Sequence, residues 1–255
     1  MCLVGLAYKV HPKFPILLIT NRDEAYARPT AQAHFWEDEP SILAGKDLEA
    51  GGTWMGVSKN GRFAALTNFR NPMMLGDDKK SRGELVTNYL KSSLGPKEWL
   101  KSIENIASDY NPFNILVGNV EELFFMSSAY NQLTEVKPGV HGLSNDSLNT
   151  SWPKVTYLTK KLSTLIKTKK TSNTELFRAL QNKKKAPIGK LPETGVGLAL
   201  EKILSPAFIE TENYGTRCST ILKISNEGEV HFSEKSHLLK ENKLVEVKFK
   251  SAEVQ

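Results

Sequence analysis

The feature that most limits how this sequence can fold is a short run near its start, residues 2–10, that is apolar on both faces of a strand. One face would carry Cys2, Val4, Leu6 and Tyr8, and the other Leu3, Gly5 and Ala7. Such a run is buried when the strand is central in a sheet that has further layers on both sides. A second apolar run, residues 15–21, follows after a connection that fits a hairpin. We therefore expect a central antiparallel strand pair within a layered fold.

The rest of the sequence contains strand-like and helix-like segments in blocks. Further strands are predicted at residues 53–58, 62–68, 113–118, 122–127, 139–145, 219–224, 229–234 and 244–250. Helices are predicted near residues 81–90, 96–106, 151–166, 172–180 and 196–204, with capping boxes at Ser81/Glu84 and Ser172/Glu175. Strands at both ends with helices between them indicate an α+β fold in which helices cover both sheet faces. The length of 255 residues suits a single domain, residues 1–255.

Composition argues against several classes of protein. No stretch approaches the ~18 consecutive apolar residues of a membrane helix, and the first thirty residues lack the pattern of a signal peptide. We therefore expect no membrane span and a cytoplasmic location. Much of the net charge of +6 comes from Lys-rich stretches at residues 167–170 and 183–185, which are typical of solvated helix ends. Because no basic face interleaved with aromatic residues is evident, nucleic-acid binding is not expected.

The two cysteines, Cys2 and Cys218, are too few for a disulfide framework. No Cys/His spacing resembles a zinc or haem-attachment site. We expect no metal site and no required cofactor.

Cys2 is the residue that points most directly to chemistry. An initiator Met before a small residue is normally removed, which would leave Cys2 with a thiol and a free α-amine, a nucleophile and a base in one residue. The reference pKa of an α-amine is about 7.7–8.0, so near neutral pH it can accept the thiol proton. The alternative is that Cys2 is a small buried hydrophobic residue.

Four polar residues, Asn21-Arg22-Asp23-Glu24, follow the second apolar run. Alternate side chains of a strand share a face, so Asn21 and Asp23 should point one way and Arg22 and Glu24 the other. If the first two strands pair, Asp23 could hold the Cys2 amine in place. The alternative is a charged strand end with an Arg22–Glu24 surface pair that contributes little stability.

A cysteine nucleophile also needs hydrogen-bond donors for the oxyanion, each typically worth about 2.7–4 kcal/mol in the transition state. Asn68 and Asn145 both follow apolar strand patterns and could supply such donors, or could simply begin turns. Arg217 precedes a later strand and could bind a substrate carboxylate or phosphate, or lie in a loop.

Taken together, these segments resemble one family, that of transport and Golgi organisation protein 2, also called the NRDE family. The matching segments are Met1-Cys2, Asn21-Arg22-Asp23-Glu24, Gly51-Gly52-Thr53-Trp54-Met55-Gly56, Leu66-Thr67-Asn68, Gly142-Leu143-Ser144-Asn145, Trp152-Pro153-Lys154 and Gly215-Thr216-Arg217. The resemblance extends from Met1 to beyond Cys218. It implies the N-terminal nucleophile hydrolase fold, a four-layer αββα sandwich with antiparallel sheets, and a relation to choloylglycine hydrolases and penicillin V acylases, which cleave amides with an N-terminal Cys.

The resemblance also implies roles for individual residues. Cys2 matches the nucleophile and Asp23 the residue that holds its amine. Asn68 and Asn145 match the two Asn positions near the oxyanion, and Arg217 matches the late active-site Arg. One departure concerns Arg22: the acylases carry an Arg separated by two residues from their Asp, whereas Arg22 is adjacent to Asp23, so a regular strand would turn Arg22 away from the thiol.

Two functions follow as hypotheses. The first is an N-terminal Cys hydrolase that cleaves a non-peptide C–N bond of a small-molecule amide. The second, from the same resemblance, is a non-catalytic carrier that holds haem or an acyl-CoA in the same cleft, and the scattered histidines show no spacing that would favour haem. Asn21, Arg22, Glu24 and Arg70 are further candidate ligand-binding residues. Nothing in the sequence indicates a partner protein or an oligomeric state.

Overall fold

The apolar run at the start of the chain forms β1 (Cys2–Tyr8), all of whose residues are buried. β1 pairs antiparallel with β2 (Ile16–Ala25) on one side and with β10 (Gly139–Leu143) on the other. The computed structural model describes residues 2–238 and 244–252. The predicted pairing of the first two strands is therefore confirmed, and β1 lies between β10 and β2 in the sheet.

A six-stranded sheet grows from this pair in the order β10-β1-β2-β11-β12-β13. Its other members are β11 (Tyr214–Ile224), β12 (Glu229–Ser236) and β13 (Leu244–Lys250). The first and last parts of the described chain thus lie side by side, because β2 pairs with β11.

A seven-stranded antiparallel sheet follows the sequence order from β3 to β9. Its strands are β3 (Thr30–Phe35), β4 (Ile42–Asp47), β5 (Met55–Ser58), β6 (Phe63–Asn68), β7 (Phe113–Gly118), β8 (Leu123–Ser127) and β9 (Gln132–Glu135). β3, β4 and β9 were not predicted from the sequence.

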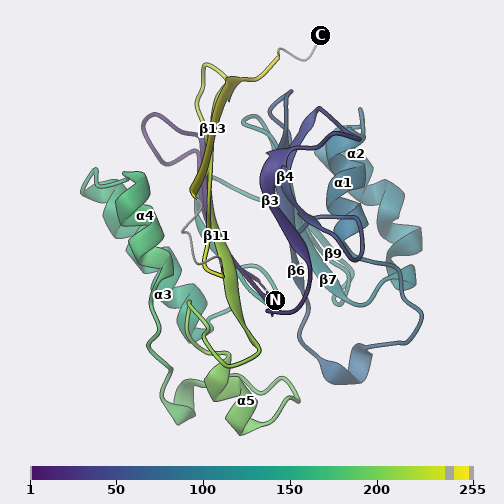
Figure 1. Cartoon of the computed structure of the whole chain (residues 1–255), viewed down its shortest axis with the longest axis vertical. Helices are drawn as coiled ribbons and strands as arrows, with labels where there is room; N and C mark the ends of the chain where they lie inside the picture. Colours follow the sequence, from purple (N-terminus) through teal and green to yellow (C-terminus); the bar gives the residue numbers. More distant parts are fainter. Residues whose placement is uncertain (1, 239–243, 253–255) are drawn as a thin grey trace.

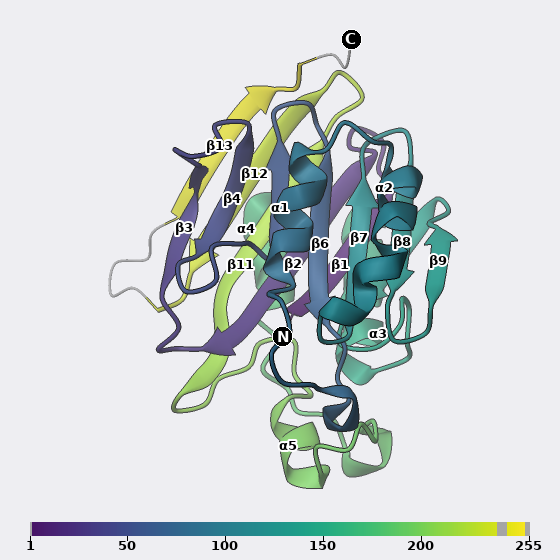
Figure 2. The ribbon, with the colours of Figure 1, turned by 90° about the vertical axis from the view of Figure 1, so that its right-hand side faces the viewer.

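Helices cover the outer face of each sheet, as Figures 1 and 2 show. α1 (Gly83–Lys91) and α2 (Pro96–Ile103) pack on the seven-stranded sheet, and α3 (Pro153–Lys167) and α4 (Asn173–Leu180) pack on the six-stranded sheet. Shorter helical turns are η1 (Pro72–Met74), η2 (Glu104–Asp109), η3 (Ile188–Lys190) and α5 (Leu198–Ile203).

Three apolar cores separate these four layers. The central core joins the two sheets and includes Val4, Leu18 and Phe63. A second core lies between the seven-stranded sheet and α1/α2, and a third between the six-stranded sheet and α3/α4. This is the expected αββα sandwich, and it explains why β1 is apolar on both faces: one face meets the other sheet and the other meets α3.

Of the two predicted N-terminal caps, at Ser172 and at Ser81, the structure contains the first and not the second. Ser172 caps α4, since its hydroxyl accepts a hydrogen bond from the Glu175 N–H at 3.4 Å. The box predicted at Ser81 is wrong: α1 has Arg82 at its N-cap with no side-chain cap, and Glu84 instead accepts a hydrogen bond from the Tyr110 hydroxyl at 2.5 Å. The Glu84 carboxylate therefore contacts Tyr110, which is distant in the sequence, and does not form the local capping box with Ser81.

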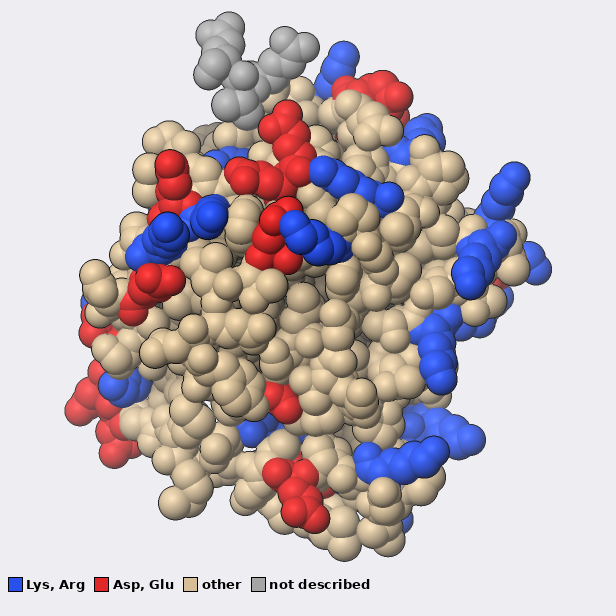
Figure 3. Space-filling view, turned by 180° about the vertical axis from the view of Figure 1, so that it is seen from behind, with Lys and Arg blue, Asp and Glu red and all other residues tan. Residues whose placement is uncertain are grey.

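The two Lys-rich stretches are exposed, as predicted. Seen from behind, Lys and Arg gather along the edge formed by the α3/α4 layer (Figure 3). Within the described residues, none of the helices is long and apolar enough to span a bilayer.

Candidate functional site

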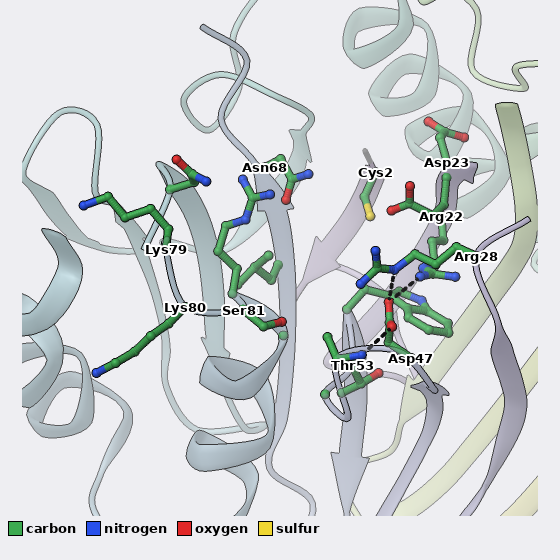
Figure 4. Close-up of a pocket in the computed structure, with 18 residues that line it drawn as sticks. Cys2, Arg22, Asp23, Arg28, Asp47, Thr53, Asn68, Lys79, Lys80 and Ser81 are labelled. Carbon is green, nitrogen blue, oxygen red and sulfur yellow. Dashed lines mark hydrogen bonds and ion pairs between the residues drawn. The ribbon is translucent and has the colours of Figure 1, made fainter. Parts of the chain in front are cut away.

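A polar cavity of about 310 Å³ opens at the ends of β1, β2 and β6, where the two sheets meet (Figure 4). Its walls come from both sheets and from the segment before α1. The lining residues are Cys2, Arg22, Asp23, Glu24, Arg28, Asp47, Ala50, Gly52, Thr53, Trp54, Leu66, Asn68, Lys79, Lys80, Ser81, Arg82, Gly83 and Asn111. Five of the predicted site residues are thus brought together: Cys2, Arg22, Asp23, Glu24 and Asn68.

A close contact between two glycine segments shapes one wall of this cavity. A Cβ atom on Gly52 would lie 2.5 Å from the carbonyl carbon of Gly83, so any larger residue would force the segment before β5 away from the start of α1. The Thr53 N–H donates to the Gly83 carbonyl at 3.3 Å across the same contact. Gly52 therefore holds the cavity wall against the start of α1.

Cys2 is the first residue of β1, its thiol is free, and the residue is only 6% exposed. Burial raises the pKa of the Cys2 thiol above its ordinary value. The Ser144 hydroxyl donates to the Cys2 carbonyl at 3.2 Å, which fixes the start of the strand. A thiol in this state is mostly protonated near neutral pH and needs a base at the moment it attacks.

Cys218 is the other free cysteine, and it is buried on β11. β1 and β11 flank β2, and Cys2 and Cys218 both lie opposite Arg22. Two strand spacings, roughly 9.5 Å, separate their backbones, and a disulfide needs Cα atoms within about 7 Å. The two thiols therefore cannot bond to each other without a rearrangement of the sheet.

Arg22 faces the cavity, so the expectation that it turns away from the thiol is wrong. Cys2 and Arg22 are direct partners in the β1–β2 register, and directly opposite residues present their side chains to the same face. The Arg22 guanidinium donates to Thr30 at 2.9 Å and to Asp47 at 3.0 Å, and it lies 4.1 Å from the centre of the Trp54 ring. Arg22 therefore forms a fixed cationic wall beside Cys2.

Asp23 lies on the opposite face of β2 from Arg22, one residue beyond the Cys2–Arg22 pair, and it also lines the cavity. Its carboxylate accepts a hydrogen bond from the Thr216 hydroxyl at 2.7 Å, and the residue is completely buried. Burial raises the pKa of Asp23, while the positive charge of Lys154 acts against that rise. The arrangement suits a carboxylate that holds a cationic amine.

Lys154 does not line the cavity but acts electrostatically on Asp23. In the sequence it stood out only as part of the family motif. It lies in the first turn of α3 and is 3% exposed, and its ammonium donates to the Leu204 carbonyl at 3.1 Å. Burial lowers the pKa of Lys154 to about 8, and the charge of Asp23 opposes that shift. The helical spacing to Leu158 and Leu162 could have signalled it, because that spacing puts Lys154 on the apolar stripe of α3.

Asn68 and Asn145 are neighbours, but only Asn68 lines the cavity. The Asn145 side-chain amide donates to the Asn68 carbonyl at 2.8 Å, and the Asn145 carbonyl accepts from the Arg70 N–H at 2.7 Å. Asn145 therefore fixes the end of β6, where Asn68 faces the cavity from the sheet opposite Cys2 (Figure 4).

Three other predicted residues lie outside this cavity. Asn21 is fully buried toward α4: its amide donates to the Leu180 and Ala207 carbonyls at 2.9 and 2.7 Å. Arg217 sits at a bulge of β11, where the register shifts, and donates to the carbonyls of Ala25, Tyr26 and Arg28. Arg70 lines an adjoining groove instead. Asn21 and Arg217 thus stabilise the backbone around β2.

The cavity carries more positive than negative side chains. Five Lys and Arg residues line it, against three Asp and Glu residues. Arg28 is held by Asp47 at 2.6 Å, whereas Arg82 takes part in none of the ion pairs of the described chain and donates to the Pro112 carbonyl at 3.3 Å. Lys80 pairs with Asp109, outside the lining, at 2.8 Å, and the Lys79 ammonium donates to the Ser108 carbonyl at 2.8 Å. Arg82 is therefore the lining cation that is left to meet an anionic group of a ligand.

The described residues contain no cluster of three or more His, Cys, Asp or Glu side chains that could hold a metal ion. Within residues 2–238 and 244–252, no histidine lines the cavity.

The family model described as Transport and Golgi organisation 2 matches residues 1–238. Similar proteins include the transport and Golgi organization 2 homologs of Mus musculus, with 29% identity over 94% of this chain and 95% of the relative, and of Homo sapiens, also with 29% identity over 94% and 95%. The Drosophila melanogaster protein is 24% identical over 92% of both chains.

Two solved hydrolases are similar in structure. A cysteine-to-alanine variant of the conjugated bile acid hydrolase from Clostridium perfringens aligns with a TM-score of 0.52 and 10% identity over 97% of this chain and 92% of that one. An N-acylethanolamine-hydrolyzing acid amidase ortholog from Caenorhabditis elegans aligns with a TM-score of 0.51 and 11% identity over 87% and 92%. At such identities the likeness establishes the fold, that of the N-terminal nucleophile hydrolases.

Proposed function

The chain belongs to the Transport and Golgi organisation 2 family, and from that premise we propose that it is a hydrolase of a non-peptide amide bond with Cys2 as its nucleophile. The observation that carries the proposal is the position of Cys2: the first residue of β1, with its thiol in a polar cavity that also contains Asp23 and Asn68. Removal of Met1 would place a free α-amine on the same residue as the thiol. Met1 itself lies outside the described residues.

The first half of the reaction would transfer the acyl group to sulfur. The Cys2 α-amine accepts the thiol proton while Sγ attacks the amide carbon, so a C–S bond forms and the carbonyl oxygen becomes an oxyanion. The raised pKa of the Cys2 thiol makes this base necessary. The Asp23 carboxylate stabilises the ammonium that results, and the Asn68 amide is the candidate donor to the oxyanion.

The second half would release the products. The α-ammonium delivers its proton to the amide nitrogen, the C–N bond breaks and the amine leaves. A water molecule then attacks the thioester, with the α-amine again as base, and the carboxylic acid departs as the thiol is restored. Protons balance over the cycle because each one taken from the thiol or from water is returned to the amine product or to Cys2.

The experiment that tests this function begins with the intact mass of untagged protein before and after reaction with a small thiol-directed electrophile. Expected are the loss of Met1 and faster labelling of Cys2 than of Cys218. A matched control carries an uncleavable extension before Cys2, which keeps the thiol but converts the α-amine to a peptide nitrogen, and this protein should label slowly. Retention of Met1, or equal labelling of the extended and native proteins, would rule out the mechanism.

A second candidate function is non-catalytic binding of an acyl-CoA or of haem in the same cavity. Arg82 favours it, since this lining residue takes part in none of the ion pairs of the described chain and its charge suits a phosphate of an acyl-CoA. Because the described cavity lining contains no histidine, haem iron would have the Cys2 thiolate as its candidate ligand there. Tight binding by the native protein together with unchanged binding by Cys2→Ala, and no turnover by either, would favour an acyl-CoA carrier over the hydrolase.

A further inference from the structure

The helical layer that covers the six-stranded sheet carries the excess positive charge of this protein. Residues 153–190, which include α3 and α4, contain ten Lys and one Arg against a single acidic residue, Glu175. This segment has a formal charge of +10, whereas the whole chain has +6, so the rest of the chain carries a net −4. In Figure 3, Lys and Arg gather along the edge formed by this layer, with few acidic side chains among them. The charge of the molecule is therefore strongly one-sided.

Most of these cations are not neutralised within the protein. Lys154 is buried, Arg178 pairs with Glu175, and Lys183 pairs with Glu210. The other eight lysines take part in none of the ion pairs of the described chain, and we call them the basic face: Lys160, Lys161, Lys167, Lys169, Lys170, Lys184, Lys185 and Lys190. All of them except Lys161 are exposed. Like charges on one face repel one another, and a negatively charged partner relieves that repulsion.

One of these lysines has a backbone conformation that glycine adopts at lower cost. Lys169 follows the end of α3 with a φ of +56°. The backbone N–H groups of Lys169 and Lys170 donate to carbonyls of the last turn of α3 at 3.0 and 2.8 Å, a helix end at which glycine is favoured. The dipole of α3 favours a cation here, but it does not account for Lys184 and Lys185, which lie beyond the end of α4.

The composition of this layer favours a lipid bilayer over a nucleic acid as the partner. Ten of its eleven cations are lysines, whose compact, hydrated charges suit diffuse attraction to an anionic surface. Its two aromatic residues, Tyr157 and Phe177, are half-buried and buried, so neither ring is fully presented for stacking on a base. Ile188 is 57% exposed and lies between Lys185 and Lys190 in the sequence. An exposed apolar side chain among lysines suits the boundary between lipid headgroups and acyl chains.

We propose that the basic face is a docking surface for a membrane that contains anionic phospholipids. The lysines attract the negatively charged headgroups, and Ile188 enters the boundary between headgroups and acyl chains. Because the attraction acts between exposed charges, the docking is peripheral and weakens as salt is added. The basic face shares no residue with the lining of the cavity that contains Cys2, so docking does not depend on the chemistry proposed there.

Sedimentation of the full chain with lipid vesicles tests the proposal. One set of vesicles contains phosphatidylcholine with about 30% phosphatidylserine, and the other contains phosphatidylcholine alone. At about 0.1 M NaCl we expect binding to the anionic vesicles that is at least about tenfold tighter than binding to the neutral ones, and at about 0.5 M NaCl we expect its loss. Equal binding to both sets, or binding to neither, would overturn the proposal.

Two double variants with the same change of charge locate the docking surface. Lys184→Gln with Lys185→Gln removes two charges from the basic face. Lys97→Gln with Lys101→Gln removes two exposed charges from α2, on the opposite outer layer. Since one lysine at an anionic surface contributes about fivefold in affinity, the first variant should bind the anionic vesicles about 25-fold more weakly. The second should change the affinity by less than about twofold, because its charges lie more than a screening length away from the membrane. Equal effects of the two variants would refute the location.

Lys169→Gly separates binding from stability. Glycine should raise the midpoint of urea unfolding, because it adopts the left-handed conformation without strain. The same substitution should weaken binding to the anionic vesicles about fivefold, because it removes one charge. Damage to the fold cannot produce both changes at once. A more stable protein with unchanged affinity for the vesicles would contradict the proposal.

Ile188→Asn and a single-stranded RNA distinguish a bilayer from a nucleic acid. We expect Ile188→Asn to weaken binding to the anionic vesicles severalfold, because an apolar contact with the bilayer is lost while the charge is unchanged. We also expect labelled RNA to be released at a lower salt concentration than the vesicles. Unchanged vesicle binding by Ile188→Asn, together with retention of RNA at a salt concentration that releases the vesicles, would identify a nucleic acid as the partner and overturn the proposal.

Discussion

The Arg22 guanidinium donates to the Asp47 carboxylate at 3.0 Å, which joins β2 of one sheet to β4 of the other at the wall of the cavity. Arg28 donates to the same carboxylate oxygen at 2.6 Å from a more exposed position. The Asp47 carboxylate is therefore shared by two arginines: Arg22, which is buried between the sheets, and Arg28, which lies near the surface.

Arg22→Gln should lower the free energy of unfolding by about 3 kcal/mol, because it removes a buried charge partner and uncovers the Trp54 ring. Arg28→Gln should cost about 1 kcal/mol or less, since that pair is partly solvated. Urea unfolding of both variants measures the difference. Equal losses would show that Asp47 does not distinguish its two partners.

Replacing both members of the Arg70–Glu201 pair should cost less stability than replacing Arg70 alone. Arg70→Met should destabilise the protein by about 3 kcal/mol, because it leaves the Glu201 carboxylate buried without its cation. Adding Glu201→Leu should recover much of that loss. A double-mutant cycle by urea unfolding measures the coupling, and additive losses would contradict it.

Lys154 predicts a shift in the pH dependence of Cys2. Its ammonium favours the charged form of Asp23, so Lys154→Met should raise the pKa of Asp23 further. The rate of Cys2 alkylation, measured on Met1-free protein as a function of pH, should fall on its acidic limb as Asp23 is protonated. In Lys154→Met this acidic limb should lie at higher pH. Lys160→Met, on the exposed side of the same helix, is the control and should leave the limb in place. A lower rate with an unmoved limb would indicate a merely structural role.

His237 predicts a loss of stability in mild acid. The Ser219 hydroxyl donates to Asn21 at 2.6 Å, so it accepts from His237 Nε2–H at 2.8 Å. Burial lowers the pKa of His237 to about 4, helped by the charges of Lys235 and Lys183. Since the unfolded chain binds the proton near pH 6.5 and the folded one only near pH 4, stability is present above pH 6.5 and falls as the pH drops toward 4, by roughly 2 kcal/mol.

His237→Gln should remove most of this pH dependence, because the glutamine amide can still donate to Ser219 and does not titrate. Urea unfolding at a series of pH values from 7 to 4 measures it. His34→Gln, at an exposed position, serves as the control. An unchanged slope in His237→Gln would assign the acid sensitivity to other groups.

The layers of this protein follow from local patterns in its sequence. A run that is apolar on both faces must lie between two apolar layers, and helical spacing of apolar residues marks the stripes of α3 and α4 that cover it. These are properties of consecutive residues, so they can be read locally. The short β3 and β9 escaped prediction because few of their residues are buried, which leaves little apolar alternation.

Which polar residues meet at the cavity depends on long-range strand pairing and packing. Strand alternation correctly separated Asp23 from Arg22, but the pairing of Cys2 with Arg22 put Arg22 beside the thiol. The bulge in β11 turned Arg217 to the carbonyls of the β2–β3 turn, and the packing of α3 brought Lys154 into the electrostatic environment of Asp23. Register and packing depend on residues far apart in the chain. A local sequence pattern does not show which distant segments pair, or in which register.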